Sequence, residues 1–309
     1  MTTLLERRLA EFVDREDELR RFCEMLEGRR KNILVVWGDS GLGKSSLLAR
    51  MIHECAQRRR TKAEVTWTDT RPHDYLAVMR KLRDDVLSSP GGAPVAPGSA
   101  TPFAAFTDLV NYFTVEHYEL TVKVEGGASI RVAEQASIQG GAAVGDVAGI
   151  MVKDVMLNSA RADMAVPEAQ RMARLTDRFL QDWQQVAGSG PVVVFFDAIE
   201  KMSRDTAKWL WGELLAPVRD GGLANVLFVL CGQRPPELDR DWDLAVETTQ
   251  LQPLPHAHIV DYLARRGVEE ASREALATLL EVTSGGKIAA IAAAVDGFLR
   301  LQAQRSLGE

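Results

Sequence analysis

The chain has little cysteine, no long hydrophobic run and no excess of basic residues, and each absence excludes a class of protein. Its three cysteines are odd in number and form no C-x-x-C pair, so neither a disulfide framework nor a zinc site is expected. No run of about 18 uncharged apolar residues occurs. Residues 1–12 carry four charges where a signal peptide needs an apolar segment. We therefore expect a cytoplasmic protein with packed, reduced thiols.

The composition is that of a folded globular protein. Apolar residues make up 46% and charged residues 26% of the 309 residues, which excludes wholesale disorder, collagen and coiled-coil architectures. The formal net charge is −6, so the whole protein has no electrostatic attraction to nucleic acid or acidic lipid, although a local basic face is compatible with this total. The length predicts two domains, or one large α/β domain with an appendage.

Short apolar runs alternate with helical periodicity along most of the chain. Continuous apolar runs are typical of strands that are buried on both faces of a parallel sheet. The predicted strands are 33–37, 64–67, 192–196, 226–230 and 245–251, and the predicted helices are 16–27, 47–56, 72–87, 168–187 and 207–215, the last with Ser203 as its N-cap.

The strand signal disappears after residue 256, where three further helices are predicted. The order of elements therefore predicts an α/β fold with a parallel five-stranded sheet flanked by helices over residues 1–252. A small all-helical lid domain follows over residues 253–309.

A segment between residues 88 and 165 interrupts this alternation. Residues 88–102 are rich in proline, glycine and serine, as in a linker or long surface loop. Alternating residues on either side of Gly126-Gly127 are compatible with a β-hairpin, and residues 140–149 show neither period. We expect 88–165 to be an irregular insert in the α/β domain, and no chemistry is assigned to it.

The sequence GDSGLGKS, residues 38–45, matches the phosphate-loop pattern G-x-x-x-x-G-K-[ST] between a predicted buried strand and a predicted helix. Glycines let backbone N–H groups approach phosphate oxygens, and the helix N-terminus adds partial positive charge. Lys44 is expected to bridge the β and γ phosphates, and the Ser45 hydroxyl to bind Mg²⁺. The expected nucleotide contacts from this loop are Gly38, Asp39, Ser40, Gly41, Leu42, Gly43, Lys44, Ser45 and Ser46.

Carboxylates follow the most apolar predicted strand. Asp197 comes directly after residues 192–196, where the strand emerges at the carboxyl edge of the sheet, and is expected to hold the metal. Glu200 is the candidate that orients the attacking water. The alternatives are that Asp197 only caps the next turn and that Glu200 is an ordinary exposed acid.

An arginine follows the next predicted strand. Arg234 is placed either to stabilise charge on the transferred γ phosphate or to lie on the surface, held by the turn that Pro235-Pro236 imposes. No Asn-Lys-x-Asp guanine-reading sequence occurs, so ATP is favoured over GTP.

Together these motifs resemble the STAND class of signal-transduction P-loop ATPases, relatives of NACHT, NB-ARC and other AAA-like proteins. Residues 12–19, FVDREDEL, look like the leading F-V-G-R-E-x-E-L signature, with Asp14 in place of glycine. The resemblance implies that Val13 and Arg15 lie near the adenine. It also makes residues 197–200 similar to the Walker B pattern of the class, and Arg234 similar to the arginine of its sensor strand, which lies between the P-loop strand and the Walker B strand.

Residues 283–290, TSGGKIAA, look like the helical-lid stretch T-x-G-N-P-L-A-L, with Lys287 where the class has proline. This leaves open whether Lys287 adds a charge at the phosphates or points to solvent. STAND proteins usually continue into a winged helix, a repeat-built sensor and an effector domain. The chain ends after the lid helices, so we expect either a piece of a longer protein or a stand-alone module.

The resemblance implies an ATP-dependent molecular switch. It would bind ATP or ADP with Mg²⁺, hydrolyse ATP slowly, and act with a protein partner or by oligomerisation in signalling, with bacterial defence as one context. An alternative is an AAA-like ATPase that remodels or loads onto nucleic acid, which predicts a basic stripe and DNA-stimulated hydrolysis. A third hypothesis is a scaffold that holds nucleotide without turning it over.

Overall fold

The computed structural model of the chain describes residues 9–28, 31–67, 74–89, 101–114, 117–124, 129–135, 152–160, 166–188 and 190–306. The chain divides into two compact units. The first comprises Met1–Ala96 and Gln184–Glu309, and the second comprises Pro97–Trp183.

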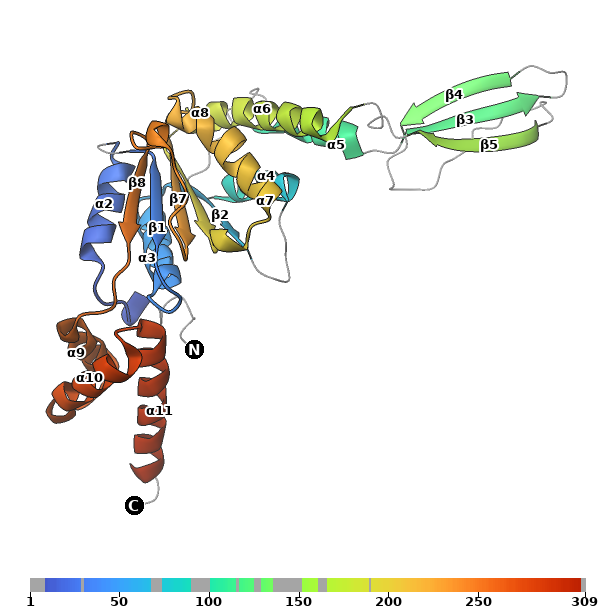
Figure 1. Ribbon diagram of the computed structural model, residues 1–309. Helices are drawn as coiled ribbons and strands as arrows, with labels where there is room; N and C mark the ends of the chain where they lie inside the picture. The colour runs from blue at the N-terminus through green and yellow to red at the C-terminus, as the bar shows by residue number, and fades with distance from the viewer. Residues whose placement is uncertain are drawn as a thin grey trace. The chain divides into compact units, whose positions relative to one another are not determined.

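A five-stranded parallel sheet forms the centre of the first unit, in the order β2-β6-β7-β1-β8 (Figure 1). Its strands are β1 (Ile33–Trp37), β2 (Thr61–Thr66), β6 (Val192–Asp197), β7 (Val226–Gly232) and β8 (Val246–Gln250). The predicted five-stranded parallel sheet is therefore confirmed. Strand β7 lies between β6 and β1, so the strand that precedes Arg234 occupies the position that the STAND resemblance implied.

The burial of each strand follows its place in the sheet. The central strands β6 and β7 are apolar and buried along nearly their whole length, because helices cover both faces of the sheet. The edge strand β2 alternates between buried and half-exposed residues. This alternation explains why the prediction of 64–67 was wrong at both ends: Thr61 and Ala63 are buried members of the strand, and Trp67 follows it.

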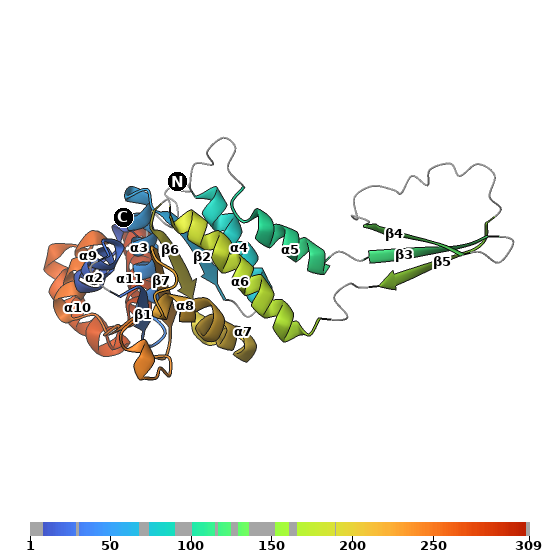
Figure 2. The same ribbon diagram turned by 90° about the horizontal axis from the view of Figure 1, so that it is seen from above.

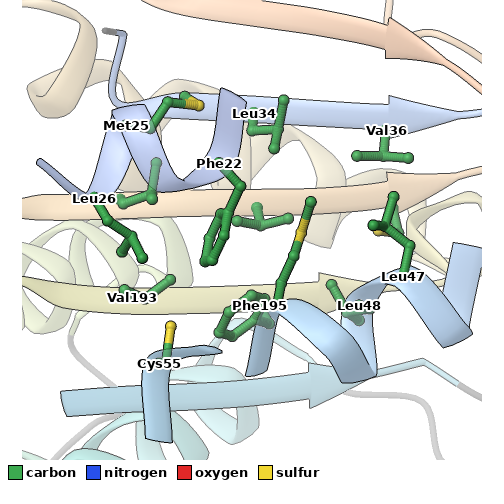
Figure 3. Close-up of a cluster of buried hydrophobic side chains, with 14 of the residues drawn as sticks. Phe22, Met25, Leu26, Leu34, Val36, Leu47, Leu48, Cys55, Val193 and Phe195 are labelled. Carbon is green, nitrogen blue, oxygen red and sulfur yellow. The ribbon is translucent and has the colours of Figure 1, made fainter. Parts of the chain in front are cut away.

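Two helices cover one face of the sheet. They are α2 (Glu16–Leu26) and α3 (Lys44–Gln57). Phe22 from α2, Leu47 from α3 and Phe195 from β6 belong to one buried cluster (Figure 3). Full burial of a side chain of this size contributes roughly 1.5–3 kcal/mol, so this cluster holds α3, and with it the loop before α3, against the sheet.

Helices α4 (Tyr75–Ser88) and α7 (Arg204–Trp209) lie on the opposite face (Figure 2). On that face the rings of Phe196 and Phe228 stack with centroids 6.1 Å apart. The N-cap prediction for α7 is confirmed, since the Ser203 hydroxyl accepts a hydrogen bond from Thr206 N over 3.1 Å. Helix α7 continues through a π-helical turn, Leu210–Leu215, into α8 (Ala216–Arg219).

Three C-terminal helices form a small layer of their own, as the sequence predicts. They are α9 (His256–Arg265), α10 (Glu270–Ser284) and α11 (Ile288–Ser306) (Figure 1). Their shared core includes Ile259, Leu280 and Ile291, and it also takes in Val13 from the N-terminal segment. We call these helices the lid. Across the described helices, none is long and apolar enough for a membrane span.

The second unit holds a three-stranded antiparallel sheet in the order β4-β3-β5. Its elements are α5 (Ala104–Thr114), β3 (His117–Val124), β4 (Ser129–Gln135), β5 (Val152–Ala160) and the start of α6 (Glu168–Ala187). Phe106 and Phe179 meet with ring centroids 5.2 Å apart, and the Asp182 carboxylate accepts a hydrogen bond from Phe106 N over 2.9 Å. These contacts join α5 to α6.

The hairpin expected near residues 118–132 is present as β3 and β4. Helix α5 and strand β5 were not predicted, so the expected insert is less irregular than its composition indicated. Gly126, Gly127 and residues 140–149 lie outside the described residues.

Candidate functional site

The phosphate-loop residues join β1 to α3 in the conformation that their glycines allow. Gly41 and Gly43 have φ values of 86° and 90°, which residues with a Cβ atom rarely adopt. A Cβ atom on Gly43 would also approach Ile288 Cγ2 to 3.0 Å. Helix α3 begins directly afterwards at Lys44, so its free N–H groups and partial positive charge face the loop.

Lys44 and Ser45 occupy the first turn of α3. The Lys44 ammonium donates hydrogen bonds to the carbonyls of Gly38 and Asp39, over 2.7 and 2.8 Å. The Ser45 hydroxyl donates to Asp197 Oδ2 over 3.1 Å. The structure therefore brings the two residues expected to hold Mg²⁺ into direct contact, although they lie 152 positions apart in sequence.

Asp197 ends β6, and the backbone behind it is strained. Its Oδ1 accepts a hydrogen bond from Ala198 N over 2.9 Å, and Ala198 adopts a φ of 57°, which costs an alanine about 1–2 kcal/mol. Strain of this kind persists where surrounding contacts determine the conformation, and it is concentrated at functional sites. It directs the chain from Asp197 into the short 3₁₀ turn Ile199–Lys201.

Glu200, in that turn, is held by a residue that the sequence analysis missed. Gln233 uses both of its N–H groups: the backbone N donates to Glu200 Oε2 over 3.2 Å, and Nε2 donates to Oε1 over 3.1 Å. Gly232 allows this approach, because a Cβ atom there would lie 2.7 Å from Ile199 Cγ1. The available signal was a polar residue directly after β7, the strand next to β6.

Arg234 is the next residue, and it lies elsewhere. It is exposed and is not among the residues that line the cavity described below, whereas Gln233 is. Its role as a γ-phosphate sensor therefore stays a prediction.

A cavity of about 580 Å³ lies between the phosphate loop and the lid, a volume in the range of small-molecule and cofactor sites. Of the predicted site residues, Gly38, Asp39 and Arg234 do not line it. Its lining residues are Glu11, Phe12, Val13, Arg15, Ser40, Gly41, Leu42, Gly43, Lys44, Ser45, Ser46, Asp197, Ala198, Glu200, Lys201, Gln233, Leu254, Tyr262, Ile288, Ala289 and Ala292.

The cavity combines a polar wall with an apolar one. The polar wall is the phosphate loop with Asp197 and Glu200. The apolar wall comes from the lid cluster and includes Val13, Leu254 and Tyr262. A polyanion beside a flat apolar ring system is the kind of ligand that matches both walls.

The lid contacts the phosphate loop directly. Ala289 N, in the first turn of α11, donates a hydrogen bond to the carbonyl of Gly41 over 3.1 Å. The Lys287 ammonium lies 3.6 Å from Asp39 Oδ2. Both of these side chains are substantially exposed, so the ion pair itself contributes little to stability. Lys287 therefore lies beside the phosphate loop with an exposed side chain, and its contact with the phosphates stays a prediction.

Two of the three cysteines belong to the buried core. All three are free, and Cys55 and Cys231 are buried. Burial raises the pKa of Cys55 to about 12, and burial together with the nearby Asp197 carboxylate raises the pKa of Cys231 far above its usual range. These two groups remain neutral thiols at physiological pH and are not nucleophiles.

The residues present fit a nucleotide with its magnesium ion. Mg²⁺ typically takes one or two carboxylates together with substrate phosphates and waters. Asp197, paired with the Ser45 hydroxyl, supplies such a set next to the loop amides. Within the described ranges no three His, Cys, Asp or Glu side chains gather into a separate metal cluster.

Comparison with known families agrees with this geometry. A model of the AAA ATPase domain matches residues 11–229. The chain belongs to this family. Membership in the AAA ATPase domain family implies nucleotide binding. No curated protein matches the chain.

Solved structures similar to this AAA ATPase domain share its fold only distantly. One is the HORMA:CdnC:Trip13 complex of E. coli MS115-1, at a TM-score of 0.44 and 11% identity, with 90% of this chain and 77% of that chain covered. A second is a STAND protein with a tetratricopeptide repeat sensor from Pyrococcus horikoshii, at a TM-score of 0.42 and 13% identity, with 89% of this chain and 28% of that chain covered. A third is Cdc6p from Pyrobaculum aerophilum, at a TM-score of 0.42 and 10% identity, with 86% of this chain and 56% of that chain covered. The chain thus spans about a quarter of that STAND protein and about half of that Cdc6p.

Proposed function

We propose that this AAA ATPase domain is a molecular switch of the STAND type. In this proposal Mg-ATP binds in the cavity between the phosphate loop and the lid, slow hydrolysis resets the domain, and the two nucleotide states differ in the position of the lid. The observation that carries the proposal is the hydrogen bond from Ala289 N to the Gly41 carbonyl, because it makes the lid a direct neighbour of the backbone that would hold the phosphates.

In this proposal the site residues have separate roles in phosphate binding, metal binding and hydrolysis. The amides of the loop and the N-terminus of α3 bind the phosphates, and Lys44 neutralises charge on them. Ser45 and Asp197 would hold Mg²⁺, and the bound ion would stabilise charge on the phosphate oxygens. Glu200 orients the attacking water, and Gln233 keeps that carboxylate in place. Arg234 does not line the cavity, so its proposed contact with the γ phosphate requires it to move when nucleotide binds.

Val13 belongs to the base end of the site. It is buried in the lid cluster and lines the cavity, which supports the predicted contact with adenine. The proposed biological setting is signalling through a protein partner or through self-association, with bacterial defence as one context. This setting rests on the STAND resemblance alone.

Binding of ATP and ADP to the wild type and to Lys44→Ala tests the nucleotide site. Loss of a charge-assisted hydrogen bond to phosphate is worth about 1.5–3 kcal/mol, so we expect affinity to fall about 10- to 100-fold. Lys208→Ala, an exposed lysine outside the cavity lining, is the matched control and should bind like the wild type. Undiminished ATP affinity in Lys44→Ala would overturn the site.

Hydrolysis and size-exclusion profiles with ATP and with ADP test the switch. We expect measurable turnover and different elution or partner binding in the two states. Nucleotide binding without turnover would favour the scaffold hypothesis. Salt-dependent DNA binding that stimulates hydrolysis would favour a nucleic-acid remodelling ATPase instead.

A further inference from the structure

The segment 11–15 is shared between the two layers that enclose the cavity. Phe12 packs against the buried cluster between the sheet and helices α2 and α3, whereas Val13 is part of the lid core. The guanidinium of Arg265 in α9 donates a hydrogen bond to the Phe12 carbonyl. The segment is therefore attached to both the α/β layer and the lid.

Arg15 makes the most specific of these connections. Its side chain is buried, and Nη2 donates to the carbonyl of Leu42 over 3.3 Å and to the carbonyl of Gln252 over 2.6 Å. Leu42 belongs to the phosphate loop, and Gln252 lies in the linker from β8 to α9. The Arg15 guanidinium thus forms hydrogen bonds both to the phosphate loop and to the linker that leads into the lid.

The backbone at Arg15 and at the residue before it is in the left-handed region. Asp14 and Arg15 have φ values of 63° and 79°, which are costly for residues other than glycine. The Asp14 carboxylate lies 3.3 Å from Arg15 Nη1 and thus occupies the other arm of the guanidinium. The donors of Arg15 are directed at two carbonyls and the Asp14 carboxylate, and Glu18 Oε1 lies 4.0 Å from Nη1. These contacts point to a role other than the predicted contact with the base.

We propose that Arg15 is a positioning residue that couples the phosphate loop to the lid. When phosphates occupy the loop and the carbonyl of Leu42 changes its position, Arg15 passes the change to Gln252 and so to α9. This inference rests on the proposed function, because it requires nucleotide at the loop. It adds a specific route by which the nucleotide state reaches the lid.

A burial penalty supports this assignment. A buried guanidinium is costly unless each donor has a partner, so displacement of either carbonyl leaves a donor unsatisfied. The bridge therefore favours concerted movement of the loop and the linker over independent movement.

Amide hydrogen exchange with and without Mg-ATP tests the coupling in the full chain, read separately over 38–48 and over the lid, 256–306. In the wild type we expect nucleotide to increase protection in both regions. In Arg15→Gln the loop response should remain while the lid response falls by about fivefold or more. Arg21→Gln is the matched control: Arg21 donates to Thr249 Oγ1 over 3.3 Å and does not line the cavity between loop and lid, so its lid response should be that of the wild type.

Arg15→Lys provides a second variant that keeps the positive charge, but its single nitrogen cannot occupy the positions of both Nη1, beside Asp14, and Nη2, between the two carbonyls. We expect it to lose most of the lid response too. A purely structural role would lower the Tm of Arg15→Lys and leave its nucleotide-dependent lid response intact, and that result would overturn the coupling. Absence of any nucleotide response in the wild-type loop would instead refute the proposed function.

Discussion

The amide of Ala289 lies 3.1 Å from the carbonyl oxygen of Gly41 and donates a hydrogen bond to it. The first turn of the last helix is therefore bonded to the middle of the phosphate loop. Any ligand that changes the path of the loop acts on the lid through this bond as well as through the loop's side chains.

Gly286 should be much less tolerant of substitution than its neighbour. It has a φ of 71°, and a Cβ atom there would lie 2.7 Å from Pro253 Cβ and 2.9 Å from the Leu254 carbonyl. Gly285 has a φ of 59° with nothing within 4 Å. We expect Gly285→Ala to cost about 1–2 kcal/mol of unfolding free energy through backbone strain alone. Gly286→Ala should cost roughly 1–3 kcal/mol more, because overlap is added to the strain.

Urea unfolding of the two glycine variants measures this difference, and equal losses would contradict the packing of the lid linker. Nucleotide affinity should fall in Gly286→Ala more than in Gly285→Ala, since only the former displaces the linker beside the cavity.

Glu200 and Gln233 should affect turnover more than binding. We expect Glu200→Gln to lower kcat about 10²- to 10⁴-fold, as for loss of a positioned general base. Gln233→Ala should lower kcat less, about tenfold, because the backbone N of residue 233 still holds one carboxylate oxygen. Steady-state ATP hydrolysis and ADP affinity, measured in both variants, separate the effect on kcat from the effect on binding.

Gln184→Ala is the matched control for Gln233→Ala, since Gln184 donates to the Gly222 carbonyl and does not line the cavity. Unchanged kcat in Glu200→Gln would remove Glu200 from the catalytic machinery. Arg234→Ala in the same assay tests the predicted phosphate sensor, for which we expect a lower kcat as well.

Asp14 stands where the STAND signature has glycine, and its φ of 63° explains the preference for glycine. Asp14→Gly and Asp14→Ala both remove the ion pair with Arg15, at 3.3 Å, and the contact with His258 Nε2, at 3.6 Å. Only the alanine variant keeps the unfavourable conformation. We therefore expect Asp14→Gly to be more stable than Asp14→Ala by about 1 kcal/mol in thermal or urea unfolding. A more stable alanine variant would contradict the left-handed geometry.

The lid should lose stability as pH rises through the neutral range. A hydrogen bond to Glu281, over 2.8 Å, and the nearby Glu274 carboxylate raise the pKa of His256 in the folded protein. The folded state therefore favours the charged imidazolium. Its contribution to stability is fully present below the unfolded pKa of about 6.5 and is lost as pH rises through the higher folded value.

Tm measured between about pH 6 and pH 8.5 checks this expectation in the wild type and in His256→Gln. The variant should show a smaller decrease of Tm with pH. His53→Gln is the control, because the His53 ring contacts Gln57 on its own helix. Parallel pH profiles for the wild type and His256→Gln would refute the role of the α9–α10 ion pair.

The fold was largely predictable because its signals are local. Strand β1 and helix α6 lie where hydrophobic period and length placed them. Edge strand β2 was predicted too short, since a half-exposed strand lacks a continuous apolar run. Helix α5 and strand β5 were not predicted, although only residues 88–102 of the insert have the composition of a linker.

The candidate site was predictable only in part. The contact of Ser45 with Asp197 follows from two motifs, because parallel strands bring their carboxyl ends to one edge of the sheet. The hydrogen bond from Gln233 to Glu200 depends on the path of the turn after β7. The position of Arg234 outside the cavity lining depends on the same turn.

The sequence by itself determined the strand–loop–helix unit of the phosphate loop, the acidic strand end and the presence of three lid helices. Glycine spacing, apolar runs and helical period act over neighbouring residues and need no knowledge of the rest of the chain. Only the tertiary structure decided what Arg15 does, because its carbonyl partners lie 27 and 237 positions away. A buried guanidinium takes whichever acceptors the folded chain brings within reach, and no local pattern specifies them.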